Sequence, residues 1–140
     1  MNLWYIAFDV LILILIGLAV YVAYFKKRKY FTGADIEMIQ KRFADLEKKL
    51  HWDPRYVVME GDKLLDFLLM KMRFKGPLGQ KLKKAGKLFS HEQDLWNAHK
   101  LRNSLAHEMG FSVDIKQARA ALKAYKSAFE QCGITFTAHE

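Results

Sequence analysis

The sequence contains one cysteine, Cys132, and two prolines among 140 residues. A single cysteine excludes a disulfide within the chain and is typical of a protein kept in a reducing compartment. The five histidines are too scattered to suggest a metal site, and no glycine-rich phosphate loop is present. The sequence therefore predicts neither a metal nor a cofactor, and it excludes the disulfide-stabilised and nucleotide-loop classes.

Charge is almost missing from the N-terminal stretch, where Asp9 is the only charged residue in the first 25. As a helix, residues 3–25 would extend about 35 Å, enough to cross a hydrocarbon core about 30 Å thick. Four cations, Lys26-Lys27-Arg28-Lys29, follow at once and no basic segment precedes the run, which favours an uncleaved anchor over a signal peptide. We predict a transmembrane anchor over 1–25 and a basic juxtamembrane linker over 26–35. The predicted location is the cell membrane as a single-pass protein, with the N-terminus outside and the C-terminal domain cytoplasmic.

The remaining sequence has helical periodicity, and no long segment alternates as a strand does. Helices are expected over about 36–52, 54–74, 80–89, 91–109 and 114–132. Their expected N-caps are Thr32 or Asp35, then Asp53, Ser90, and Ser112 or Asp114. The predicted fold class is all-α: a single N-terminal transmembrane helix plus a small up-down four-helix bundle with an extra short helix. The bundle spans 36–132, and 133–140 form a flexible tail. The apolar stripes place six residues in the core: Phe43, Leu46, Leu65, Leu68, Leu105 and Leu122.

The helix over 91–109 carries Arg102-Asn103-Ser104-Leu105-Ala106-His107. An arginine can bind a phosphate through two parallel hydrogen bonds, and a histidine can transfer a proton near neutral pH. The pattern thus indicates a site that binds and cuts a phosphodiester without metal. On an ideal helix Arg102 lies about 140° from His107, so only a long side chain or a second subunit brings them together. The alternative is that these residues cap carbonyls and pair with neighbours, as charged residues do on ordinary helices.

The pattern Arg102-Asn103-x-x-x-His107 lies late in the third main helix, within WNAHKLRNSLAHE, and resembles the signature of the HEPN superfamily. The resemblance covers about residues 36–132. It implies metal-independent RNA cleavage by two subunits that pair their motif helices. Arg102 would hold the scissile phosphate, His107 would exchange protons, and Asn103 would orient one of them. The superfamily also contains noncatalytic scaffolds, so a catalytically silent, membrane-tethered dimerisation or interaction module is the alternative.

The formal net charge of +8 indicates anionic partners. One run contains seven cations and no acid: Lys71, Arg73, Lys75, Lys81, Lys83, Lys84 and Lys87. It suits RNA, anionic lipid or a solvated surface, and these three alternatives stay open. We also expect a homodimer whose contact is a stripe of Trp96, His99, Asn103 and His107. The sequence does not identify a protein partner.

Overall fold

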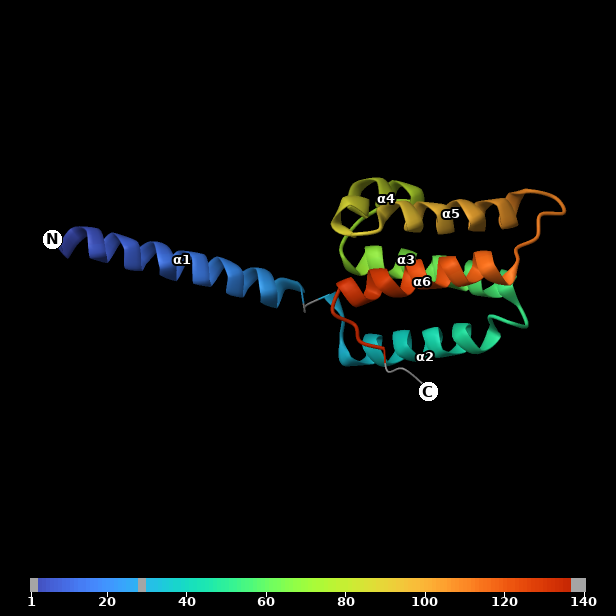
Figure 1. The fold of residues 1–140 in the computed structure, drawn as a ribbon, viewed down its shortest axis with the longest axis horizontal. Coiled ribbons are helices and arrows are strands. Elements are labelled where there is room, and N and C mark those ends of the chain that lie inside the picture. Colours follow the sequence, from blue (N-terminus) through green and yellow to red (C-terminus); the bar gives the residue numbers. More distant parts are fainter. Residues whose placement is uncertain (1–2, 28–29, 137–140) are drawn as a thin grey trace. The chain divides into compact units, whose positions relative to one another are not determined.

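The computed structural model describes residues 3–27 and 30–136, and the elements within these ranges are helices (Figure 1). They are α1 (Leu3–Lys27), α2 (Gly33–Lys49), α3 (Pro54–Lys71), α4 (Leu78–Ala85), the short 3-10 helix η2 (Gly86–Leu88), α5 (Glu92–His107) and α6 (Ile115–Gln131). Residues up to Tyr30 form one compact unit, and the chain from Phe31 onward forms a second.

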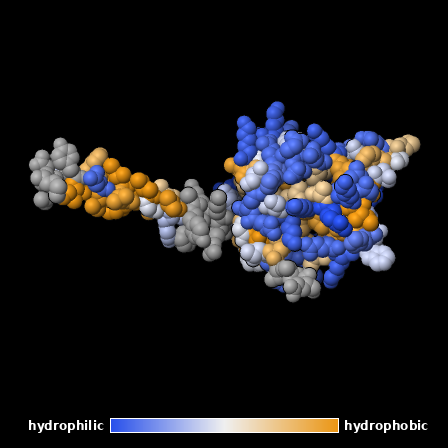
Figure 2. Space-filling view, in the orientation of Figure 1, coloured by the Kyte–Doolittle hydropathy of each residue, from blue (hydrophilic) through white to orange (hydrophobic). Residues whose placement is uncertain are grey.

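Helix α1 consists largely of apolar residues, and many of its large side chains, Trp4 and Phe8 among them, are exposed (Figure 2). A transmembrane span needs about 20 consecutive apolar residues. Within residues 3–27 and 30–136, no helix is both long and apolar enough to cross a bilayer. The predicted transmembrane helix over 1–25, and with it the predicted fold class and single-pass membrane localisation, are therefore wrong. Arg28 and Lys29 of the basic segment lie outside the described residues.

In the second unit, α3 and α6 share the most extensive contact and lie side by side in the middle of the bundle. Helix α2 packs on one side of this pair, and α5 packs on the other, with α4 beside it over α3 (Figure 1). The main helices α2, α3, α5 and α6 run in alternating directions. The core is thus built between the central pair and its two covering helices. All six residues predicted for the core are buried, which confirms the periodicity: Phe43, Leu46, Leu65, Leu68, Leu105 and Leu122.

Local rules explain most helix starts. Thr32 caps α2 in a reciprocal capping box with Asp35, Asp53 caps α3 ahead of Pro54, and Asp114 caps α6. The Ser90 cap is not formed: α5 begins after His91, which makes no side-chain cap hydrogen bond. Ser90 instead contacts α6, because its backbone N–H and its hydroxyl both donate to Oε1 of Gln131.

Two other boundaries differ from the sequence expectation. The short helix forms over Leu78–Ala85, directly after Pro77, rather than over 80–89. The flexible tail expected from residue 133 is ordered at first, because Ile134 is buried and the ring of Phe136 packs edge-on against Phe43 at 4.8 Å between centroids. These apolar side chains extend the core past the end of α6. Residues 137–140 lie outside the described part of the chain.

The α3–α6 contact depends on a glycine. A Cβ built on Gly61 would collide with the ring of Tyr125, a fully buried side chain in α6. We expect Gly61→Ala to lower the free energy of unfolding by about 1–3 kcal/mol, because the packed helices must separate to admit the methyl group. Urea denaturation measures this loss. Gly33→Ala, where a Cβ meets nothing within 4 Å, is the matched control and should leave stability unchanged or raise it slightly.

A second prediction concerns Asp35. The ammonium of Lys71, 2.8 Å from Oδ2, and the backbone N–H of Thr32 lower the pKa of this carboxyl from 3.8 to about 2. A folded-state pKa below the unfolded value contributes stability above about pH 4, and that contribution is lost as the pH falls through 2. NMR titration of the carboxyl should therefore give a midpoint near 2, and Asp35→Asn should flatten the acid side of the stability curve. An ordinary midpoint near 4 would contradict the Lys71 contact.

Candidate functional site

Helix α5 carries the Arg102–His107 motif and is oriented by its apolar side. Leu95, Ala98 and Leu105 are buried against the core. The neighbouring side of the helix, which includes His99 and Asn103, then faces α3 and the start of α4. The same packing directs the side chain of Arg102 toward α3.

At the centre of the site lies Asp62 of α3, whose side chain is 6 % exposed. Its Oδ1 lies 2.9 Å from Nδ1 of His99, and its Oδ2 lies 3.3 Å from Nε of Arg102. Asn103 completes the cluster: its Nδ2 is 3.3 Å from Nε2 of His99, and its Oδ1 accepts from Nη1 of Arg102 at 3.2 Å. We call Asp62, His99, Arg102 and Asn103 the polar network.

One assignment of protons satisfies every member of the polar network. The carboxylate of Asp62 can only accept, so Nδ1 of His99 carries a hydrogen. The amide nitrogen of Asn103 can only donate, so Nε2 of His99 accepts in this assignment. The amide oxygen of Asn103 is then turned toward Arg102. Throughout the described residues, every buried side-chain nitrogen and oxygen has a hydrogen-bond partner.

The network engages two of the three nitrogens of the Arg102 guanidinium. A guanidinium has five N–H donors, and here Nε faces Asp62 while Nη1 donates to Asn103. In the part of the chain that the structure describes, no acceptor pairs with Nη2. The Arg102 side chain as a whole is 31 % exposed. Arg102 is therefore oriented by a buried carboxylate and keeps donors for an external anion.

The buried phenol of Tyr125 lies beneath this cluster. Burial raises the pKa of Tyr125 well above 10, and the nearby charge of Asp62 adds to the shift while Arg102 opposes it. The hydroxyl is therefore neutral at physiological pH, and its closest acceptor is the carbonyl of Val58 at 3.5 Å. Tyr125 supports the network and takes no part in proton transfer near neutral pH.

The polar network forms one wall of a cleft of about 440 Å³, a size typical of small-molecule sites. Helix α3 and the start of α4 form the rest of the wall, which comprises Lys63, Asp66, Pro77, Leu78 and Gly79. No cluster of three or more metal-ligating side chains occurs among the described residues. The polar groups that line the cleft are the guanidinium of Arg102, the imidazole of His99, the amide of Asn103, the ammonium of Lys63 and the carboxylates of Asp62 and Asp66.

His107, the predicted proton-transfer residue, lies elsewhere. It is the last residue of α5 and is exposed, next to the fully exposed Met109. No partner of His107 is found within residues 3–27 and 30–136. The helix end is fixed by Arg55, whose Nη2 donates to the carbonyl of Leu105 at 3.0 Å. The structure thus brings Arg102 and Asn103 together and keeps His107 apart from them within one chain.

The four residues of the predicted dimer stripe do not form one exposed surface. The side chain of His99 is only 12 % exposed because it faces Asp62. Trp96 packs edge-on to His99 with 6.2 Å between ring centroids, and its Nε1 donates to Glu92 at 3.4 Å. A contact through all four residues would have to displace the polar network. The dimer itself stays a prediction.

Of the seven predicted RNA- or lipid-contacting cations, two are engaged within the chain. Nζ of Lys71 pairs with Asp35 at 2.8 Å, and Nζ of Lys81 pairs with Asp66 at 2.9 Å. The other five are exposed: Arg73, Lys75, Lys83, Lys84 and Lys87. The run is therefore partly structural and partly a free basic surface.

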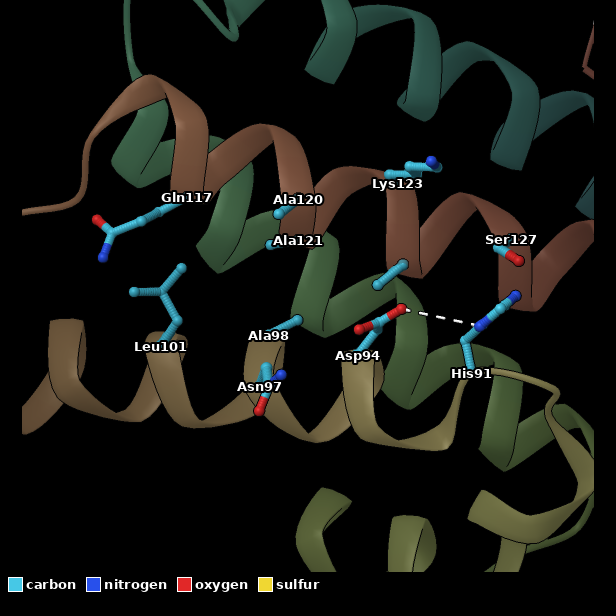
Figure 3. Close-up of a pocket in the computed structure, with 11 residues that line it drawn as sticks. His91, Asp94, Asn97, Ala98, Leu101, Gln117, Ala120, Ala121, Lys123 and Ser127 are labelled. Atoms are coloured by element: carbon cyan, nitrogen blue, oxygen red, sulfur yellow. Dashed lines mark ion pairs between the residues drawn. The ribbon is translucent and has the colours of Figure 1, made fainter.

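A separate groove of about 470 Å³ lies between α5 and α6 (Figure 3). His91 and Asp94 stand near one end, and Leu101 and Gln117 near the other, with alanines between them. His91 Nδ1 and Asp94 Oδ2 are 4.0 Å apart and both side chains are about two-thirds exposed, so this pair is weak. The groove has no oriented reactive group comparable to the polar network.

No family model, no curated protein and no solved structure matches the chain. The resemblance to the HEPN superfamily therefore rests on the motif residues alone and stays a prediction.

Sequence reasoning missed Asp62, although a signal was available. Val58, Leu65 and Leu69 lie four residues before and three and seven residues after it, and all three are buried. A carboxylate at a core position of an apolar helix requires a buried partner. The position of Asp62 in the sequence could have indicated that α3 contributes to the site. It could not have indicated which residues of α5 contact the carboxylate.

We expect Asp62→Asn to lower the free energy of unfolding by about 1.5–3 kcal/mol, the usual cost of losing a hydrogen bond that involves a charged group. The Arg102 charge would also lose its counter-ion. Asp45→Asn, which breaks an exposed pair with Lys49, should cost less than about 0.5 kcal/mol. Urea denaturation compares the two. Equal small effects would show that the polar network contributes nothing to stability.

Proposed function

We propose that the bundle binds the phosphodiester backbone of RNA at the cleft through Arg102, and that paired copies cleave it without metal. The observation that carries this proposal is the orientation of Arg102. A buried carboxylate holds its Nε edge while Nη2 stays available beside an open cleft. Fixed donors of this kind are suited to a phosphate oxygen, which gains two charge-assisted hydrogen bonds.

The reaction requires two proton movements. The 2′-oxygen attacks the phosphorus while the bond to the 5′-oxygen breaks, so one proton leaves the 2′-hydroxyl and one reaches the departing oxygen. His107 is suited to such transfers because it is exposed and an imidazole can both accept and donate a proton. His99 is not, because both of its ring nitrogens are occupied within the polar network.

Cleavage by this proposal needs a second copy. Five residues on a helix separate Arg102 from His107 by about 7.5 Å of rise and about 140° of rotation. The Arg102 side chain is also turned back toward Asp62. A twofold contact near the ends of two α5 helices would place His107 of one copy near Arg102 of the other. The HEPN resemblance implies the same kind of composite site.

The second candidate is a catalytically silent interaction module. It is favoured by the distance of His107 from the polar network, and by the fact that the network's hydrogen bonds are satisfied within one chain. In that case Asp62, His99 and Asn103 hold α5 on α3, and the exposed end of α5 carries the contact with a partner.

Cleavage of labelled single-stranded RNA by the full-length protein in EDTA separates the two. On the proposed function, Arg102→Ala and His107→Ala each lower the rate at least about 100-fold, the usual contribution of one proton-transfer group. His51→Ala, which removes another exposed histidine, is the control and should leave the rate unchanged. Absence of cleavage by the wild-type protein would favour the interaction module.

Mixing the two inactive variants tests the composite site. A mixed dimer of Arg102→Ala and His107→Ala retains one site with an intact arginine from one chain and an intact histidine from the other. Part of the activity should therefore return on mixing. If both residues act from the same chain, no mixed site is intact and the mixture stays inactive.

A further inference from the structure

We infer that the five exposed cations between α3 and α5 form a track that leads single-stranded RNA to the cleft. They are Arg73, Lys75, Lys83, Lys84 and Lys87, and we call them the basic track. This inference rests on the proposed function, because it assigns the surface that supplies affinity to the same site.

Among the described residues, no ion pair neutralises the charge of the basic track. No acidic residue occurs between residues 71 and 87. Lys71 and Lys81 are held by Asp35 and Asp66, whereas no carboxylate in the described ranges pairs with the five track residues. Cations without acidic neighbours attract phosphates through counter-ion release, which gives most of the affinity of nonspecific RNA binding.

Helix α4 has two exposed lysines. Leu78, Lys81, Leu82 and Ala85 are buried, whereas Lys83 and Lys84 are exposed. Lys87, in the 3-10 helix η2 that follows α4, is exposed as well. Figure 2 shows hydrophilic side chains over this part of the bundle.

The track and the cleft share helix α4. Leu78 and Gly79, at its first turn, line the same cleft as Arg102 and Asn103. Lys83 and Lys84 lie about one turn further along the same helix. A strand whose phosphate is held at Arg102 can therefore extend along α4. This shared helix favours RNA over anionic lipid, because a bilayer would not need the cleft.

The backbone at Arg73 supports the assignment independently. Arg73 has φ of +67° and occupies the position after the α3 cap, with its N–H bonded to the carbonyl of Met70 and that of Phe74 to the carbonyl of Leu69. Glycine is the favoured residue at this position. Arg73 adopts this positive φ at a conformational cost, and its exposed side chain does not offset the cost by packing in the core. A role for its charge would explain why an arginine stands there.

The test is the salt dependence of RNA binding by the full-length protein, measured by fluorescence anisotropy with a labelled single-stranded RNA. Each lost contact to a single strand makes the slope of log K against log salt shallower by about 0.7. The triple variant K83A/K84A/K87A should therefore lose about 2 from the slope. The matched control K41A/K48A/K116A removes the same charge from exposed positions on α2 and α6 and should leave the slope near that of the wild type.

Arg73→Gly adds a readout that a structural role would not give. It should raise the urea midpoint, because glycine accepts the positive φ, and weaken RNA binding with a slope shallower by about 0.7. A more stable variant with unchanged RNA binding would remove Arg73 from the track.

The outcomes separate this inference from the proposed function. If Arg102→Ala weakens binding and the α4 triple variant does not, the track is overturned and the cleft proposal stands. If the wild-type protein binds no RNA, both fail. Vesicles of phosphatidylserine and phosphatidylcholine provide the other arm: loss of vesicle binding by the triple variant, with RNA binding unchanged, would overturn the track in favour of a lipid surface.

Discussion

The carboxylate of Asp62 is the constraint on which the candidate site depends. Moving a charge into a helix interface is unfavourable unless partners compensate it. Its two oxygens face His99 and Arg102, which lie on successive turns of α5. Apolar contacts alone tolerate small rotations of one helix on another, whereas a charge with two directional partners does not. The pairing therefore fixes both the rotation of α5 against α3 and the direction of the Arg102 side chain.

The contact with Asp62 affects both the orientation of the Arg102 guanidinium and the strength with which its charge attracts an anion. The same carboxylate that holds Nε of Arg102 also offsets its positive charge, so the guanidinium is a weaker attractor of distant anions than a free arginine. The guanidinium is better placed to bind an anion in direct contact, because the Arg102 side chain loses less conformational freedom on binding. Asn103 contributes by linking Arg102 to His99 through hydrogen bonds from its two amide atoms. A protonated His99 would turn a donor toward the amide nitrogen of Asn103 and break the network.

Much of the fold follows from short-range rules in the sequence. The apolar spacing that buries Phe43 and Leu105 can be read from a window of a few residues, and so can the caps at Asp53 and Asp114. Features set by distant residues could not be read. Ser90 lies one residue before the observed N-cap of α5 and donates to Gln131, 41 positions later, a contact that no local window contains. The apolar run at the N-terminus predicted a membrane span from composition, and no helix among the described residues meets the requirement for one.

The candidate site was predictable only in part, because it too depends on residues that are distant in sequence. Arg102 and Asn103 are adjacent in sequence, and the motif predicts that they act together, but the carboxylate that orients Arg102 lies 40 positions earlier on another helix. His107 shares a helix with them and still lies apart, because helical rotation outweighs closeness in sequence.

On the proposed function, the basic track and the cleft contribute differently to RNA binding. Arg102, already paired with Asp62, can contribute position but little long-range attraction. The exposed lysines of α4 have the opposite character, since their flexible, unpaired charges attract any phosphate and specify none. If RNA is the ligand, affinity should come mainly from α4 and depend steeply on salt, while the cleft sets which phosphate is held. Whether that held phosphate is then cut depends on a histidine that a single chain does not bring to it.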